Sequence, residues 1–211
     1  MSGIQSLHSS TKFTAVLRTA MVLIVDSLGV EREVRALLDS GSQASFISES
    51  CVQLLGLKRS NGRVIISGIG NASAGSSRGT VTISLKPRSK LHQINVDALV
   101  IPKVAARLPD MISREDLKWL STVELADPKF YKSRTIDILL GADVFFAILE
   151  NGQLKSPTSN LVAQNTIYGW VIGGSSLTKS AGVQSHCTIL NIDQTLRRFW
   201  EIENANSEQN N

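Results

Sequence analysis

The sequence predicts a mainly β chain that carries only a few short helices. Its apolar stretches are short, rich in β-branched residues and separated by glycine and small polar residues, which is typical of strands and turns. Residues 80–85 alternate between hydroxyl and apolar side chains, as a strand with one buried face does. Helical periodicity extends over only about two turns at any place. With 211 residues, 42% of them hydrophobic, the chain is long enough for one domain with a substantial core.

The first part of the chain predicts a hairpin that ends at an aspartate. Residues 12–27 are apolar and β-branched, and we expect them to form one or two strands before a turn centred on Gly29. In the strand that follows, Val34 and Leu38 fall on the same face, because side chains alternate along a strand. This second strand would deliver Asp39 at its end.

A short strand at 44–48 and a helix of about two turns are expected next. Ser48 is a good N-cap residue, Glu49 favours the positive end of a helix, and Gly56 is well suited to follow the last turn. Residues 64–85 then predict a long hairpin, because strand patterns enclose a segment rich in glycine and small residues.

The second half of the chain contains one interruption of the β pattern. A strand at 92–102 is followed by an insert in which Ser113 starts a helical pattern with Leu117 and Leu120 in register. After the insert, residues 135–149 predict a buried strand, a glycine and an apolar helix or turn.

The polarity of the two ends suggests where the domain begins and stops. Residues 161–174 predict the closing strands, and the chain becomes polar after them. We therefore expect a flexible tail at 1–11, one domain at 12–175, and a polar linker at 176–211 that contains a short amphipathic helix.

Charge and composition argue against several classes of protein. The net charge is +4, but lysine and arginine occur singly or in pairs, so we expect no nucleic-acid binding by this domain. No apolar stretch is long enough to cross a bilayer, and no membrane contact is expected. His8, His92 and His186 lack the spacing of metal ligands, so neither a metal nor another cofactor is expected. Cys51 and Cys187 form no disulfide framework, which suggests a reducing, cytoplasmic location.

The segment Asp39-Ser40-Gly41-Ser42 has two interpretations. Asp-Ser-Gly is common in ordinary turns, where the aspartate hydrogen-bonds to nearby backbone. Its place at the end of an apolar strand favours a partly buried carboxylate, which is costly unless it accepts hydrogen bonds. Gly41 lets the backbone direct N–H groups at that carboxylate, and the two serines supply hydroxyls. These residues alone leave open whether the segment is a plain turn or holds a catalytic aspartate.

Three segments together resemble a known family. The stretch LLDSGSQASFIS at 37–48 resembles the active-site loop of retropepsin-type aspartic peptidases. DILLGAD at 137–143 is similar to the segment that packs under that loop, and IISGIGNAS at 65–73 stands in the place of their flap. With LRTAMV, VAQNTIYGWVIGG and the trailing LRRFWEIE, the set resembles the protease segment of BEL/Pao retrotransposon polyproteins over residues 12–202.

The resemblance implies a retropepsin-like closed β-barrel protomer with a flap hairpin, acting as a homodimer. Asp39 would be the catalytic residue. The residues that would shape or support its loop are Ser40, Gly41, Ser42, Leu140 and Gly141. The flap tip over the substrate would consist of Gly68, Ile69 and Gly70. The chain departs from compact viral proteases in the insert between Pro102 and Ile136.

The number of aspartate loops determines the expected assembly. Neither Asp26 nor Asp143 is followed by a Ser-Gly pair, so the resemblance implies a dyad of Asp39 from two chains. The expected function is an aspartic endopeptidase that acts on its own polyprotein, within the cell or within retrotransposon particles. The alternatives are a domesticated or inactive module for dimerisation or peptide binding, a ubiquitin-linked cellular retropepsin, and a generic β-barrel binding protein.

Overall fold

The computed structural model describes residues 12–67, 73–87, 93–105 and 114–178. The strands are β1 (Lys12–Val16), β2 (Thr19–Val25), β3 (Glu31–Leu38), β4 (Ser45–Ser48), β5 (Ile65–Ser67), β6 (Ser73–Ser76), β7 (Thr80–Lys86), β8 (Ile94–Ile101), β9 (Ile138–Leu140), β10 (Leu149–Lys155), β11 (Asn160–Thr166) and β12 (Gly169–Thr178). The helices are α1 (Glu49–Leu55) and α2 (Ala142–Phe145), with the 3-10 helices η2 (Arg114–Leu120) and η3 (Phe146–Ile148).

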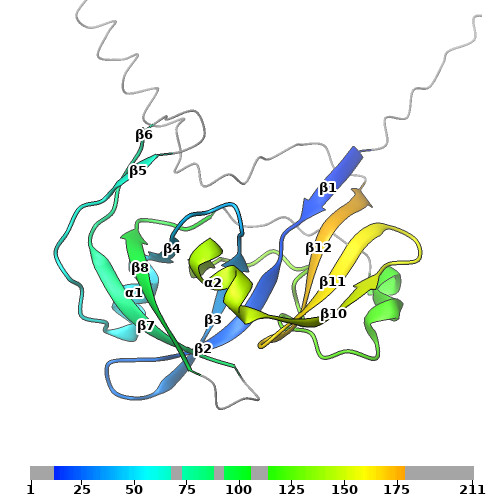
Figure 1. The fold of residues 1–211 in the computed structure, drawn as a ribbon, viewed down its shortest axis with the longest axis horizontal. Helices are drawn as coiled ribbons and strands as arrows, with labels where there is room; N and C mark the ends of the chain where they lie inside the picture. The colour runs from blue at the N-terminus through cyan, green and yellow to red at the C-terminus, as the bar shows by residue number, and fades with distance from the viewer. Residues whose placement is uncertain (1–11, 68–72, 88–92, 106–113, 179–211) are drawn as a thin grey trace, which may run out of the picture.

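A closed barrel of six strands forms one half of the fold, on the left of Figure 1. The strand order is β2-β3-β9-β4-β8-β7, and the pairing of β7 with β2 closes the ring. The short strand β9 runs parallel to β3 and antiparallel to β4. A segment about 100 positions later in the chain therefore lies between the two strands that flank the Asp39 loop.

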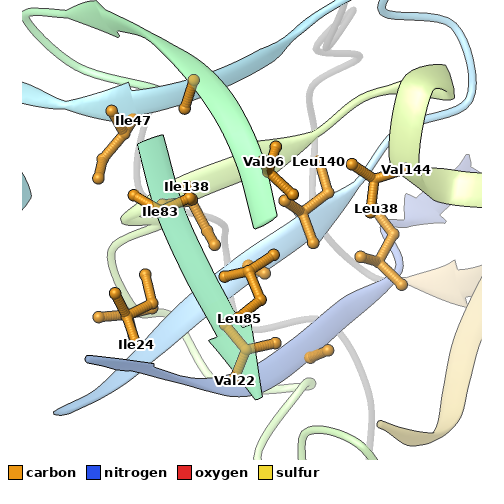
Figure 2. Packing of buried hydrophobic residues seen from close by; sticks show 14 of the residues in the cluster. Val22, Ile24, Leu38, Ile47, Ile83, Leu85, Val96, Ile138, Leu140 and Val144 are labelled. Carbon is orange, nitrogen blue, oxygen red and sulfur yellow. The ribbon is translucent and has the colours of Figure 1, made fainter. Parts of the chain in front are cut away.

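The barrel interior is packed with aliphatic side chains from every strand. Figure 2 shows Val22 and Leu85 near each other at the lower centre, with Leu38, Leu140 and Val144 gathered toward the upper right of the view. Leu85 and Leu140 are completely shielded from solvent. The alternation predicted for residues 80–85 is confirmed, because the apolar members face this core.

A second, four-stranded sheet lies beside the barrel, on the right of Figure 1. Its order is β1-β12-β11-β10, and all of its pairs are antiparallel. One face buries Leu161, Ala163 and Ile172 against Leu120 and Phe130 of the insert. The insert therefore covers one face of this sheet and leaves the opposite face uncovered by the insert.

A buried ion pair attaches the insert to the barrel. Arg35 of β3 donates to the Asp127 carboxylate over 2.7 Å, and both side chains are 1% exposed. The same guanidinium donates to the Phe130 carbonyl, and Thr19 donates to Asp127. Leaving either charge alone in this interior would cost about 3–5 kcal/mol. The insert is thus held to the strand that carries Asp39.

The first hairpin and the first helix agree with the sequence analysis. Strands β2 and β3 pair across the turn at Gly29, whose φ is +80°. Ser48 caps α1 by accepting from the Cys51 N–H at 3.2 Å. Gly56 ends the helix with a left-handed φ of 61°. Residues 12–25 form two strands because the pairing breaks between β1 and β2.

The long hairpin predicted for residues 64–85 is only partly present. Strands β5 and β6 pair with each other and stand above the barrel in Figure 1, but β7 pairs with β8 and β2 instead. The chain leaves the hairpin at Gly79, where an added Cβ would lie 2.5 Å from the Ser60 carbonyl oxygen. Thr80 then forms a bridge with Ser60, and this contact redirects β7 into the barrel wall.

Other elements also depart from the expected pattern. The helical segment with Leu117 and Leu120 is a 3-10 helix, and Ser113, its expected cap, lies outside the described residues. Strand β10 was not predicted, because its sequence LENGQLK is polar and lacks a clear alternation. Strand β12 continues to Thr178, and the predicted tail at 1–11 lies outside the described residues, as does most of the predicted linker.

Two further expectations bear on the environment of the chain. None of the helices in the described part is long and apolar enough to span a membrane. Cys51 is a buried free thiol, and burial raises its pKa to about 12. Cys187 lies outside the described residues.

Candidate active site

Asp39 follows the last residue of β3 and lies in a tight loop. Its backbone N–H donates to the Leu140 carbonyl of β9 at 2.9 Å, so the parallel pairing of β3 and β9 continues to the aspartate itself. Its side chain accepts from the Gly41 N–H at 2.9 Å through Oδ1 and from the Ser42 hydroxyl at 3.0 Å through Oδ2. Both carboxylate oxygens are therefore oriented by neutral donors.

The segment after β9 supports this loop from below. The Gly141 N–H donates to Ser45 Oγ at 3.1 Å, and the Ala142 N–H donates to the Ser42 carbonyl at 2.8 Å. An added Cβ at Gly141 would lie 2.4 Å from the Ala44 carbonyl oxygen, so only glycine allows this approach. Ser45 also donates to the Asp143 carboxylate at 2.9 Å.

Most of the predicted site residues meet at this place. Leu140 is fully buried beneath the loop, whereas Ser40 and Gly41 are exposed on its outer side. Ser42 is nearly buried, with its hydroxyl directed at Asp39. The predicted flap tip residues Gly68, Ile69 and Gly70 lie outside the described residues, and β5 and β6 lead toward them.

Asp39 lines a cavity of about 420 Å³. The barrel contributes Leu37, Leu38 and Asp39, and the junction of β1 and β2 contributes Leu17 and Arg18. The remaining wall comes from α2 and the four-stranded sheet, and it contains Phe145, Leu149, Gln153, Val162, Gln164, Gly173 and Gly174. The face of the sheet that the insert leaves open is therefore one side of this cavity.

The surroundings of Asp39 contain one carboxylate and one guanidinium. Among the described residues that line the cavity, Asp39 is the only acidic side chain and Arg18 the only basic one. The carbon of the Arg18 guanidinium lies 4.8 Å from the centre of the Phe145 ring. Burial lowers the pKa of Arg18, and the negative charge of Asp39 acts in the opposite direction. No group of metal-ligating side chains gathers anywhere in the part of the chain that the structure describes.

Sequence reasoning missed Arg18 and the wall formed by the sheet. The alternation along β11 could have placed Val162 and Gln164 on one face, but it does not show which face turns toward Asp39. Arg18 is one of many single basic residues in the sequence. The pairing of β2 with β3, extended by the hydrogen bond from the Leu38 N–H to the Arg18 carbonyl at 2.9 Å, brings the two segments together.

A family comparison covers the loop and its support. The family model described as Aspartyl protease matches residues 25–144, which is more than half of the chain and includes Asp39, Gly41 and Gly141. The chain belongs to the aspartyl protease family. Strand β1, Arg18 and the strands β10 to β12 fall outside the matched residues. The cavity of this family member therefore combines a shared loop with a wall from outside the matched segment.

The solved structures that this family member resembles are distant in sequence. One is the EIAV protease in complex with an inhibitor, at 16% identity and a TM-score of 0.31, covering 68% of this chain and 93% of that chain. Another is a retropepsin-like aspartic protease from Rickettsia conorii, at 12% identity and a TM-score of 0.32, covering 80% of this chain and 97% of that chain. No curated protein matches this chain.

The family match and the closed barrel together answer the expectation about fold class. The mainly β fold with a closed barrel and few short helices is confirmed. The resemblance to aspartic peptidases is likewise confirmed at the level of the family. The roles of the individual loop residues, the BEL/Pao type and the homodimer stay predictions.

Proposed function

We propose that this chain is an aspartic endopeptidase whose active site contains Asp39 from each of two copies. The observation that carries the proposal is the Asp39 carboxylate, held by Gly41 and Ser42 at the mouth of a cavity large enough for part of a peptide. Neutral donors orient both oxygens without fixing the carboxylate as a permanent ion pair. An aspartate in this setting can exchange a proton during a reaction.

The chemistry requires a second carboxylate close to the first. In an aspartic dyad the ionised member removes a proton from water, while the protonated member donates a hydrogen bond to the scissile carbonyl. The described part of the chain offers no second acidic side chain to this cavity, because Asp39 is its only acidic lining residue. A twofold homodimer with Asp39 on its axis would supply both members from one sequence.

The elements around the loop fit the remaining roles. Strands β5 and β6 stand over the barrel and lead to the segment of Gly68, Ile69 and Gly70, which would close over the substrate. Leu140 and Gly141 would hold the loop in place, and Ser40, which is exposed, would contact the partner copy. The substrate would be an extended polypeptide. The BEL/Pao-like motifs suggest that it is the polyprotein from which this segment derives.

A peptide-library digestion tests the proposal directly. Wild-type protein should cleave peptides, a statine-type inhibitor should block cleavage, and Asp39→Asn should not cleave. Specific activity should also fall on dilution through the range where sedimentation shows dissociation to monomers, because the dyad needs both copies. Adding excess Asp39→Asn chains should inhibit the wild type by forming mixed dimers.

Two results would contradict specific parts of this proposal. A specific activity that stays constant where the protein is monomeric would exclude the shared dyad. A correctly folded wild type that binds peptides but never cleaves them would favour the alternative, a retropepsin-fold module for peptide binding or dimerisation.

A further inference from the structure

Arg18 is held in a fixed position inside the cavity of Asp39. An added Cβ at Gly173 would lie 2.9 Å from Arg18 Cγ, so the aliphatic stem of the arginine lies directly on the backbone of β12. The guanidinium lies over the Phe145 ring, with 4.8 Å between the guanidinium carbon and the ring centre. Gly173 on the side of the aliphatic stem and the Phe145 ring under the guanidinium thus confine the Arg18 side chain.

The charge of Arg18 has no hydrogen-bonding partner among the described residues. None of the ion pairs in the described part involves Arg18, and its guanidinium makes none of the hydrogen bonds found there. The oxygens of Asp39 are already engaged by Gly41 and Ser42. Arginine stays charged at neutral pH even where burial lowers its pKa, as it does here. A confined, partly buried cation therefore faces the cavity with unused donors.

We propose that Arg18 determines substrate specificity by binding the carboxylate of an acidic side chain beside the scissile bond. This inference rests on the proposed peptidase function. The planar fork of a guanidinium matches a carboxylate through two parallel N–H···O bonds. The cavity has room for such a side chain, and Leu37 and Val162 offer apolar walls to its methylene groups.

A neutral substrate of the same shape would not satisfy this cation. Glutamine can accept one hydrogen bond from the guanidinium but brings no opposite charge, so part of the desolvation cost of Arg18 stays uncompensated. We therefore expect a peptide with glutamate at the relevant position to be cleaved about tenfold better than its glutamine counterpart, the size typical of a hydrogen bond to a charged group.

The test uses paired peptides that differ only by glutamate or glutamine at each position near the cleaved bond. The quantity measured is the ratio of kcat/KM for the two members of a pair. Wild type should prefer glutamate at one position by about tenfold, and Arg18→Gln should bring that ratio to about one, mainly by slowing the acidic peptide. Arg32→Gln is the matched control, because it removes the same charge from the tip of the β2–β3 hairpin and should keep the preference.

The possible contrary results are distinguishable. Equal cleavage of acidic and neutral peptides by the wild type, or an unchanged ratio in Arg18→Gln, would overturn the inference while the peptidase function stands. If kcat/KM of Arg18→Gln falls equally for every peptide and the dimer dissociates, Arg18 contributes to the contact between copies and not to specificity. If kcat/KM falls equally while the dimer stays intact, Arg18 acts on Asp39 and not on the substrate side chain. Absence of any cleavage by folded wild type would overturn the proposed function and this inference with it.

Discussion

Asp26 and Asp39 begin from the same local structure. Each follows a strand, each precedes a serine, and each accepts a hydrogen bond at 2.9 Å from the backbone N–H two residues further on. The partner of the second oxygen differs. Asp26 accepts from the Arg32 guanidinium at 3.0 Å, whereas Asp39 accepts from the Ser42 hydroxyl at 3.0 Å.

The difference separates a structural carboxylate from a candidate catalytic one. The backbone hydrogen bond from Val30, with help from Arg32 and Leu28, lowers the pKa of Asp26, and this carboxylate is held as the ionised partner of Arg32. Asp39 has neutral donors, a cavity in front of it and the backbone of Leu140 and Gly141 behind it. The turn is common to both aspartates, whereas the neutral donors and the cavity distinguish Asp39.

The largest contrast should appear when each aspartate is replaced by asparagine. Asp39→Asn should lower kcat by roughly a thousandfold or more, because an amide cannot take or give the proton. Asp26→Asn should retain most of the activity. Peptide cleavage and near-UV circular dichroism on both variants check this, since both should stay folded. A comparable loss in the two variants would mean that the Asp39 loop is merely another turn.

The two glycines that accompany these turns should also respond differently. Gly141→Ala should lower the free energy of unfolding by about 1–3 kcal/mol and reduce cleavage, because the new methyl group would overlap the Ala44 carbonyl. Gly29→Ala meets no atom within 4 Å, and its φ of +80° should cost about 1 kcal/mol without affecting cleavage. Urea unfolding and kcat/KM measure both effects. Intact cleavage in a destabilised Gly141→Ala would show that the loop tolerates displacement.

A smaller effect is expected from Ser42→Ala. The variant loses the hydroxyl that donates to Asp39 Oδ2, and a hydrogen bond to a carboxylate favours its ionised form. Loss of one bond of about 1 kcal/mol should move the pH profile of kcat/KM upward by roughly half to one pH unit. The Gly41 N–H remains, so turnover should persist. A profile that stays in place or moves downward would contradict a donor role for Ser42 in the active dimer.

The smallest effect concerns the pH dependence of stability at Asp26. Its pKa is lower in the folded chain than the ordinary value of about 3.9, so its contribution to stability is present at neutral pH and is lost as the pH falls through that region. The stability gap between wild type and Asp26→Asn should therefore narrow between about pH 5 and pH 3. Urea unfolding across this range measures the gap, and a constant gap would indicate that the pKa of Asp26 is the same in the folded and the unfolded chain.

The features that the sequence predicted correctly depend on neighbouring residues. Alternation identified the β2–β3 hairpin and β7, and the preferences of serine and glycine identified the ends of α1. The support of the Asp39 loop by residues 140 and 141 was expected only from the resemblance to aspartic peptidases. The Asp39 N–H donates to the Leu140 carbonyl, and the supporting role of the two residues stays a prediction.

The features that escaped prediction depend on pairing between distant segments. Lys12 pairs with Thr178, and no local pattern of either strand indicates that partner. The wall of the cavity and the position of Arg18 follow from this pairing. The split of the predicted hairpin has the same cause, since the bridge between Ser60 and Thr80 redirects β7 toward β8.

The ion pair between Arg35 and Asp127 limits how positions 35 and 127 could have changed during evolution. With the insert in place, replacing Asp127 alone would leave the buried Arg35 guanidinium without its counter-ion, at a cost of about 3–5 kcal/mol. That is a large part of the 5–15 kcal/mol by which a typical domain is stable. While the insert is kept, position 127 can therefore become apolar only together with position 35. Among related sequences, these two positions should be charged together or apolar together.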